Sequence, residues 1–264
     1  MTVGSPSFAH PVDRQLARAV DELGRTSFAP QLLTYLNGAV RADHCVLYRF
    51  GADEPEILGA ASIDGTRLAG LNSQRYKREF WRRDTVLTRL TARICGYASE
   101  VACVPSDQIE DPEFRHQLFH AQGLSGRAML IGDRESGLYG LSLFRRSQLG
   151  FFSLAETEAI ASQADMLVSC IAKHGTLLRR TQESASLLLS IGRIEARMHE
   201  MAPALTGRER QVCARLIYGL EVKEAAKELG ISPESAVTYR KRAFLRLGVS
   251  TRTELLRELL RTDH

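Results

Sequence analysis

The side chains best suited to chemistry lie in residues 230–248, GISPESAVTYRKRAFLRLG. No acid follows Glu234 there, and the cations of the segment are Arg240, Lys241, Arg242 and Arg246. Threonine can donate or accept a hydrogen bond at a base edge, lysine can reach guanine acceptors, and a valine methyl group suits a thymine methyl group. Arginine and lysine also bind phosphates, which give affinity without sequence information. These residue types favour a nucleic-acid ligand, although a solvated basic helix in a small bundle is the alternative.

One helix would present these side chains together. Ser232 is a typical N-cap and Pro233 suits the first helical position. Helical spacing predicts an inner face of Ala236, Tyr239, Ala243 and Leu247. The opposite stripe consists of Val237, Thr238, Lys241, Arg242 and Leu245. A recognition helix places its N-terminal half in the major groove, so this stripe is the part that would meet bases.

Two further helices precede this one. Thr206 and Glu209 have the spacing of a capping box, and Gly219 ends the first helix. A short second helix in EVKEAAKELG ends at Gly230, and its small residues, Ala225 and Ala226, suit a close crossing of two helices. Helix, glycine-containing turn and helix together predict a helix-turn-helix.

The tail resembles the LuxR-type (GerE-like) helix-turn-helix domain in LTGRERQV, KEAAKELGIS and SAVTYRKRAFLRLGVSTRTEL, over about residues 202–263. The resemblance implies four helices, of which the last, Thr251 to Leu260, commonly helps dimerisation. It also implies that Val237, Thr238 and Lys241 read the groove. The family usually has Lys at the position of Val237 and His at that of Tyr239, so the DNA sequence read here differs from the usual one.

The expected DNA contacts are these base-reading positions and nearby side chains that can bind phosphates. They are Lys223, Ser232, Ser235, Val237, Thr238, Arg240, Lys241, Arg242 and Arg252. The charge distribution agrees with this choice. The chain of 264 residues has a net charge of +4, and residues 204–264 hold 12 Lys and Arg against 8 Asp and Glu, while residues 1–203 hold 23 of each.

Composition places the chain among ordinary globular proteins, with 44% hydrophobic and 25% charged residues. No apolar run reaches the ~20 residues of a membrane span. The first residues lack the pattern of a secretory signal, so we expect a cytoplasmic protein that does not enter a membrane. Five scattered cysteines without a Cys-x-x-Cys motif predict neither a disulfide frame nor a zinc site.

The front of the chain predicts an α+β domain. Residues 13–24, 28–42, 72–92, 111–123 and 153–174 read as helices, and residues 44–50, 56–62, 94–102 and 126–147 as strands, the last a hairpin. This order suits an antiparallel sheet flanked by helices on both sides. It resembles the GAF/PAS-like sensors and the autoinducer-binding domain that often precedes LuxR-type tails, followed here by an all-α four-helix domain.

A small-molecule pocket is the hypothesis for the segment RYKREFWRRDTV. The autoinducer-binding domain uses a Tyr, a Trp and an Asp-Pro pair around a lactone, and Tyr76, Trp81 and Asp84 would take those parts. Trp81 lies between the other two and Thr85 replaces the proline, which argues against an acyl-homoserine lactone. The candidate ligand contacts are Tyr48, Tyr76, Phe80, Trp81 and Asp84. The alternative is that Phe80 and Trp81 are core residues and that Asp84 pairs with Arg82, Arg83 or a backbone amide.

The sequence offers no complete set of residues for a metal site or for an enzyme active site. His116 and His120 have the spacing of helical metal ligands, but no third ligand converges with them, so we expect a polar helix face and no metal. No acid, base and nucleophile converge either, so we expect no enzyme and no cofactor other than a small-molecule inducer. A third hypothesis is an adaptor that binds a partner through the basic run Arg75 to Arg83.

The expected domains are a sensor over residues 1–174, a helical linker over 175–202 and the DNA-binding domain over 203–264. Residues 177–201 look helical without a break, and Leu187, Ile191, Ile194, Met198 and Met201 form a short heptad seam. The seam predicts either a dimer helix or a helix packed on its own domain. The expected partners are double-stranded DNA, a second copy of the chain, a small-molecule ligand and RNA polymerase.

Overall fold

Five strands with apolar residues on both faces form the centre of the first part of the chain. They are β1 (His44–Phe50), β2 (Glu56–Ser62), β3 (Ser99–Pro105), β4 (Leu124–Arg134) and β5 (Gly137–Arg146). Their order in the sheet is β2-β1-β5-β4-β3, and all four neighbouring pairs are antiparallel. The predicted strands at residues 44–50 and 56–62 and the predicted hairpin are confirmed.

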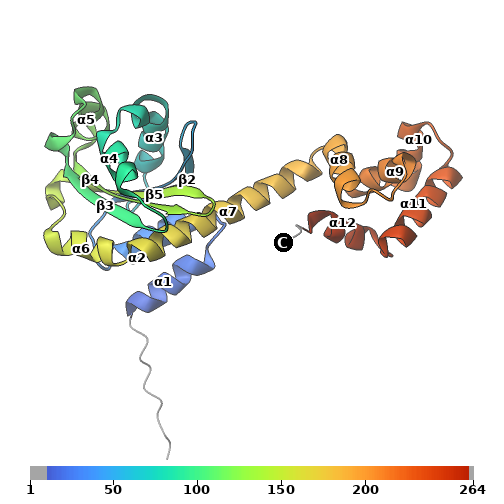
Figure 1. Ribbon diagram of the computed structural model, residues 1–264, viewed down its shortest axis with the longest axis horizontal. Helices are drawn as coiled ribbons and strands as arrows, with labels where there is room; N and C mark the ends of the chain where they lie inside the picture. The colour runs from blue at the N-terminus through green and yellow to red at the C-terminus, as the bar shows by residue number, and fades with distance from the viewer. Residues whose placement is uncertain (1–10, 262–264) are drawn as a thin grey trace, which may run out of the picture. The chain divides into compact units, whose positions relative to one another are not determined.

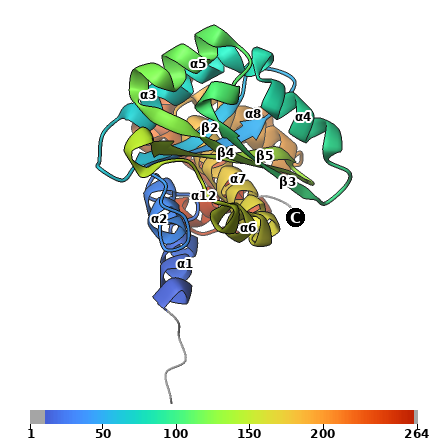
Figure 2. The ribbon, with the colours of Figure 1, turned by 90° about the vertical axis from the view of Figure 1, so that its left-hand side faces the viewer.

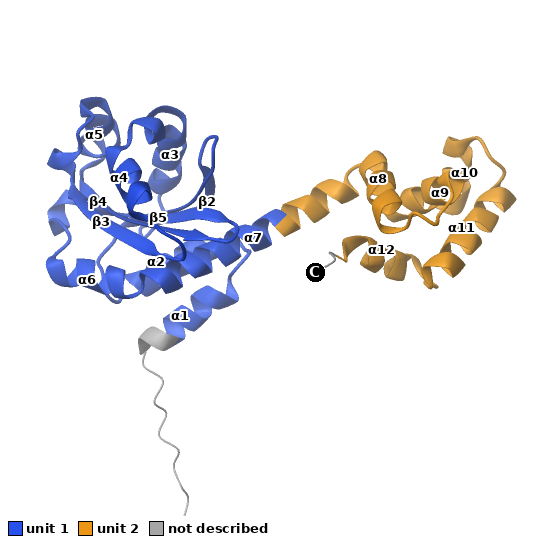
Figure 3. Ribbon diagram, in the orientation of Figure 1, with its two compact units in different colours: residues 1–179 blue, residues 180–264 orange. Residues whose placement is uncertain are grey.

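The structure is a computed structural model that describes residues 11–261. Contacts divide the chain into two units, residues 1–179 and residues 180–264, which are called unit 1 and unit 2 (Figure 3). Within the described residues, no helix is both long enough and apolar enough to cross a membrane.

Helices cover both faces of the sheet in unit 1 (Figures 1 and 2). One face packs against α1 (Pro11–Asp21), α2 (Phe28–Leu36), α6 (Leu154–Ser162) and α7 (Ala164–Leu188). The other packs against α3 (Leu68–Arg75), α4 (Thr85–Arg93) and α5 (Pro112–Leu118). Successive strand residues alternate between the two cores: Cys45 and Leu47 face the first, Val46 and Tyr48 the second. The predicted antiparallel sheet flanked by helices is confirmed.

Several helix boundaries differ from the prediction for local reasons. The helix expected over residues 28–42 ends at Leu36, where the Asn37 side chain donates to the carbonyls of Leu33 and Ala42. The expected helix over 153–174 is interrupted at Gln163, and the strand expected at 94–102 begins only at Ser99. Short 3-10 turns fill several connections: Trp81–Arg83, Ser106–Gln108, His120–Gln122 and Ser147–Leu149.

The segment expected as one or two helices over residues 72–92 has a more complex form. After α3 the chain continues as a π-helix, Tyr76–Phe80, and then as the 3-10 turn. Asp84 has extended backbone angles and caps α4, because its carboxylate accepts from the amides of Val86 and Leu87. π-Helical segments are rare and frequently occur at functional sites.

Unit 2 contains α8 (Ile191–Met201), α9 (Gly207–Tyr218), α10 (Val222–Leu229), α11 (Pro233–Leu247) and α12 (Arg252–Leu260). The Thr206–Glu209 capping box and the stop at Gly219 are confirmed. Gly230 ends α10 with φ of 64°, a left-handed conformation that glycine adopts without strain. The last four helices are those that the sequence predicted for the tail.

The uninterrupted helix expected over residues 177–201 is wrong. α7 ends at Leu188, and Ser190 caps a new helix by accepting from the amide of Arg193. Ile194 and Met198 of the heptad seam are fully buried in the core of unit 2, together with residues of α9, α11 and α12. The centre of the seam therefore packs within its own unit.

We expect Ala236→Leu to destabilise unit 2. Ala236 is fully buried in a small cluster with Val212, Leu216 and Ala226, so added methylene groups have no space. Overpacking of this kind typically costs ~1–3 kcal/mol. Urea unfolding followed by far-UV circular dichroism measures the loss. Ala196→Leu adds the same atoms at an exposed position on α8 and serves as control; equal effects of the two variants would contradict the packing.

Candidate functional site

Helix α11 begins where the sequence places its cap. The Ser232 hydroxyl accepts from the amide of Ser235 at 3.2 Å, and Pro233 occupies the first turn. The Ser232 hydroxyl also donates to the Ser235 hydroxyl at 3.1 Å. Both serines are thus engaged in forming the start of the helix, and Ser232 remains exposed.

The inner face of α11 consists of small residues. Ala236 and Ala243 are fully buried, one against α9 and α10 and the other in the core shared with α8 and α12. Tyr239 and Leu247 are partly buried at the edges of these two clusters. Alanine at the crossing points allows close helix contact, which fixes the direction in which the opposite stripe points.

The opposite stripe of α11 faces solvent. Thr238, Lys241 and Arg242 are exposed, Val237 is partly exposed, and 84% of Leu245 is accessible. The Thr238 hydroxyl donates to the carbonyl of Glu234 at 2.9 Å, so its free lone pairs make it an acceptor. An acceptor at this position suits a base amino group rather than a guanine oxygen.

The remaining candidate DNA contacts surround this stripe. Lys223 on α10 and Arg252 at the start of α12 are exposed, and Arg240 is partly buried. A surface groove between the end of α9, the start of α10, α11 and the start of α12 brings three of the cations together. Its wall includes Arg240, Lys241 and Arg252, with Phe244 and Leu245 between them.

Arg246 has a different role from its basic neighbours. Its guanidinium pairs with Glu209 at 2.7 Å and donates to the carbonyl of Ala204 at 3.1 Å. Glu209 is almost fully buried and also accepts from the amide of Thr206 at 2.8 Å as part of the capping box. Arg246 therefore joins α11 to the start of α9, although its own side chain is also exposed.

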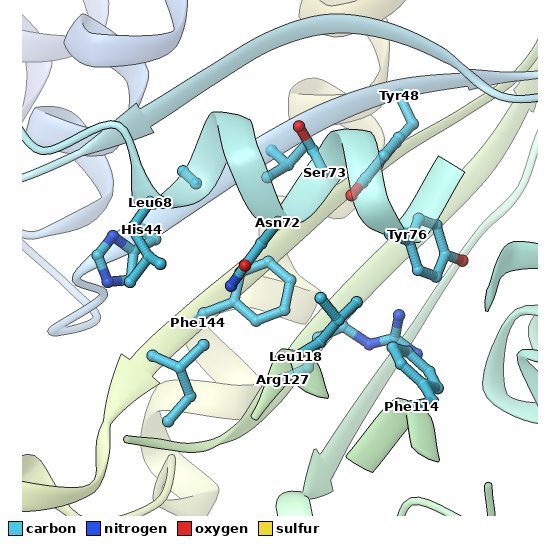
Figure 4. Close-up of a pocket in the computed structure, with 13 residues that line it drawn as sticks. His44, Tyr48, Leu68, Asn72, Ser73, Tyr76, Phe114, Leu118, Arg127 and Phe144 are labelled. Atoms are coloured by element: carbon cyan, nitrogen blue, oxygen red, sulfur yellow. The ribbon is translucent and has the colours of Figure 1, made fainter. Parts of the chain in front are cut away.

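Unit 1 contains a small cavity of about 20 Å³ on the side of the sheet that carries α3 and α5 (Figure 4). Strands β1, β4 and β5 form its floor and the two helices its cover. The wall is mostly apolar and aromatic. It consists of His44, Val46, Tyr48, Leu68, Ala69, Asn72, Ser73, Tyr76, Phe114, Leu118, Leu124, Arg127 and Phe144.

The candidate ligand residues divide into two groups. Tyr48 and Tyr76 belong to the cavity wall, whereas Phe80, Trp81 and Asp84 lie outside it. Phe80 is fully buried, and its ring stacks on Phe114 with 5.2 Å between centroids. Trp81 is partly buried under the guanidinium of Arg82, and its indole nitrogen is buried without a partner among residues 11–261.

Asp84 pairs with Arg127 of β4 and not with its arginine neighbours in sequence. The two guanidinium Nη atoms of Arg127 donate to the two carboxylate oxygens at 2.8 and 2.9 Å. Tyr76 donates its hydroxyl proton to the same carboxylate at 2.8 Å, in addition to the two amides of α4. Arg83 instead pairs with Asp111 and Glu113 on the surface.

This arrangement keeps Asp84 ionised inside the protein. Burial by itself would raise its pKa, but the charge and the hydrogen bonds of Arg127 outweigh burial, and the pKa lies below its ordinary value. The pKa of Tyr76 is raised, first by burial and then by the Asp84 charge, so its hydroxyl stays protonated and donates. The group is a neutral unit made of one cation, one anion and one phenol.

Sequence reasoning missed four polar residues of the cavity wall: His44, Asn72, Ser73 and Arg127. Arg127 is 2% exposed and its Nε has no hydrogen-bond partner among residues 11–261. His44 is 1% exposed; its Nδ1 contacts the Ser62 hydroxyl at 2.9 Å, and its Nε2 likewise has no partner in that range. Burial lowers the pKa of His44, which favours the neutral ring. A charged residue within the apolar strand RAMLIG was the available signal for Arg127.

Known proteins are similar to this chain in its tail, and one relative is similar over more than half of the chain. The family described as bacterial regulatory proteins, luxR family, matches residues 203–259. A relative from Aeromonas salmonicida, described as an HTH-type transcriptional regulator in the exeN 3' region, is 30% identical over 163 residues, which are 55% of this chain and 77% of that protein. The chain belongs to the luxR family. Because this is a family of regulatory proteins, membership agrees with the expectation that the chain is not an enzyme.

Other relatives of this luxR-family chain are similar only in its tail. Transcriptional regulatory protein UhpA of Escherichia coli is 47% identical over 55 residues, or 21% of this chain. The chain spans about a quarter of the length of the two UhpA relatives that it matches, 28% and 26%.

Two solved structures are similar to this luxR-family chain at low identity. Escherichia coli SdiA has a TM-score of 0.46 at 14% identity and covers 93% of this chain and 94% of its own. The ligand-binding domain of VqsR from Pseudomonas aeruginosa has a TM-score of 0.45 at 15% identity, over 62% of this chain and 96% of its own.

We expect the stability of unit 1 to depend on the charge of Asp84. Asp84→Asn keeps the shape but leaves Arg127 buried without its counterion, which typically costs ~3–5 kcal/mol. Because the folded pKa of Asp84 is lowered, the advantage of the native chain is complete above the ordinary pKa of about 3.9 and is lost as pH falls through the folded pKa. Trp81 is the only tryptophan, so its fluorescence during urea unfolding reports on unit 1.

Asp53→Asn is the matched control, because Asp53 lies exposed between β1 and β2. It should leave the free energy of unfolding nearly unchanged at every pH. If the difference between native chain and Asp84→Asn stayed constant from about pH 7 to about pH 2, the ionised pair would not be its source.

We expect Arg246→Ala and Arg242→Ala to separate folding from binding. Loss of Arg246 leaves Glu209 buried with fewer partners, so unit 2 should lose ~1–3 kcal/mol. Loss of the exposed Arg242 should change stability by no more than ~0.5 kcal/mol and should weaken DNA binding. Urea unfolding and a DNA titration on each variant test this; a stability loss in Arg242→Ala that matches Arg246→Ala would refute the distinction.

Proposed function

We propose that this luxR-family protein is a sequence-specific DNA-binding regulator of transcription whose front domain binds a small molecule and thereby controls DNA binding. The DNA-binding part of the proposal rests on the stripe of α11. Thr238, Lys241 and Arg242 are exposed together there, while the alanines of the opposite face are buried. The small cavity of unit 1 supports the sensing part.

The proposed division of labour assigns residues 1–174 to sensing, 175–202 to the connection and 203–264 to DNA. Ile194 and Met198 of α8 are fully buried with residues of α9, α11 and α12, the helices to which the proposal assigns DNA binding. A homodimer through α12 is part of the proposal, because two half-sites raise specificity above that of one small reader. Control of transcription in bacteria further implies a cytoplasmic protein that works with RNA polymerase.

The adaptor hypothesis has less support. Two cations of the run Arg75 to Arg83 are neutralised by acids of unit 1: Lys77 pairs with Glu54 at 3.6 Å and Arg83 with Asp111 at 3.2 Å. These pairs reduce the positive charge available to a partner. No comparable ion pair involves Lys241 or Arg242 within residues 11–261.

We expect Lys241→Ala to cost ~1–3 kcal/mol in specific binding and to relax the preference at one base position. Selection of DNA from a random pool by the purified protein first gives the preferred sequence, and half-sites about 10–10.5 bp apart would show binding as a dimer. Titrations at several salt concentrations then give the affinity of the variant. Affinity should fall steeply with salt in both proteins, because phosphate contacts release counterions.

Lys173→Ala is the control, because it removes the same charge from an exposed position on α7 in unit 1. If Lys241→Ala weakened all DNA sequences equally, Lys241 would be a phosphate contact only. If selection enriched no sequence at all, the proposal of a sequence-specific regulator would fail.

A further inference from the structure

The polar groups of the cavity in unit 1 restrict which molecules it can bind. This step rests on the proposed sensing function and goes further by naming the class of ligand. Most of the wall is aliphatic or aromatic, so the bulk of a ligand must be apolar. The polar side chains of the wall are those of His44, Tyr48, Asn72, Ser73, Tyr76 and Arg127. Two buried nitrogens among them, Arg127 Nε and His44 Nε2, have no hydrogen-bond partner in the described chain.

Arg127 Nε is a donor that needs an acceptor. The two Nη atoms of the same guanidinium are fixed by Asp84 at 2.8 and 2.9 Å, so the group cannot turn to satisfy Nε without breaking that pair. A buried donor without a partner is costly, and a ligand oxygen that meets it recovers that cost. The guanidinium always carries its proton, so this position selects for an acceptor at any pH.

The charges of the wall select against an anion. Arg127 is already neutralised by Asp84, and the cavity wall contains no lysine, no second arginine and no acid. His44 is neutral, since burial lowers its pKa. A carboxylate in the cavity would therefore add one unbalanced negative charge to a buried site, whereas a ketone, ester or lactone oxygen would add none.

Asp84 cannot accept a hydrogen bond from a ligand. Its carboxylate has about four acceptor positions and already receives five donors: two from Arg127, one from Tyr76 and the amides of Val86 and Leu87. A ligand N–H directed at Asp84 would displace one of these donors. Asp84 therefore imposes no requirement for a ligand N–H.

We propose that the cavity binds an uncharged, mainly apolar molecule that presents a carbonyl-type oxygen to Arg127 Nε and needs no N–H group for Asp84. At about 20 Å³ the space admits little more than a water molecule, so binding must displace part of the cover. The cover consists of α3, the π-helix that continues it, and α5. The first two segments contribute Leu68, Ala69, Asn72, Ser73 and Tyr76, and α5 contributes Phe114 and Leu118.

Four probes of nearly equal shape test the proposal on the full chain. They are acetophenone, benzamide, benzoate and ethylbenzene, titrated by saturation-transfer NMR at neutral pH. Acetophenone should bind best, and ethylbenzene and benzoate should each be weaker by about ten-fold, the first for lack of an acceptor and the second for its charge. Benzamide should bind no more tightly than acetophenone.

Two variants locate the effect. Ala69→Leu fills the cavity and should abolish binding of all four probes, since Ala69 is a buried residue of the wall. The double variant Arg127→Met with Asp84→Asn removes both charges of the pair, which avoids leaving one of them buried alone. In this variant acetophenone should lose its advantage over ethylbenzene.

The outcomes separate the two levels of the proposal. If no probe binds, or if Ala69→Leu binds them all as before, the cavity is not a ligand site and the sensing function falls with it. If acetophenone and ethylbenzene bind equally well to the native chain, or if benzoate or benzamide binds best, the cavity remains a ligand site and the inference about Arg127 and Asp84 is wrong.

Discussion

The ion pair between Asp84 and Arg127 determines the form of unit 1 around the cavity. Burying a pair of charges is costly, and good pairing geometry together with further hydrogen bonds offsets that cost. Here the two Nη atoms of Arg127, the Tyr76 hydroxyl and two amides of α4 provide these bonds for the carboxylate. The same bonds fix the first turn of α4, the position of the π-helix and one wall of the cavity. Asp84 is therefore a structural centre, and this group supplies Arg127 and Tyr76 to the cavity wall.

Unit 2 also contains a buried acid that pairs with an arginine, Glu209 with Arg246. Because Glu209 is buried, its ion pair with Arg246 gives one cation of α11 a structural role. Fully buried Ala236 and Ala243 bring the helix close to its neighbours and fix its rotation. Because these contacts lie on one side, the remaining cations and Thr238 are left on the other. The surface that can meet DNA is thus a consequence of which side chains the core of the unit requires.

Local signals account for what could be predicted from the sequence. Caps and glycines placed the four tail helices, because Thr206, Ser232 and Gly230 act on their own neighbours in the chain. The sheet followed from apolar runs between turns. Tyr48 and Tyr76 of the hypothesised pocket line the cavity, but the position of Arg127 could not be predicted, because Arg127 and Asp84 are distant in sequence and meet only through the fold. The break after Leu188 was missed for a similar reason: the apolar spacing continues through it, and only the core of unit 2 decides where Ile194 lies.

The sheet itself limits how a ligand could influence the rest of unit 1. The cavity lies on the face covered by α3 and α5, whereas α7, which runs from Ala164 to Leu188 and so past the end of unit 1, packs on the opposite face. Arg127 and the next residue of β4, Ala128, point to these two sides. A ligand alters an equilibrium only by binding one state better than another. An opening of the cover over Tyr76 alone would leave α7 unaffected, so control of α7 requires that the ligand shift a strand of the cavity floor, β1, β4 or β5.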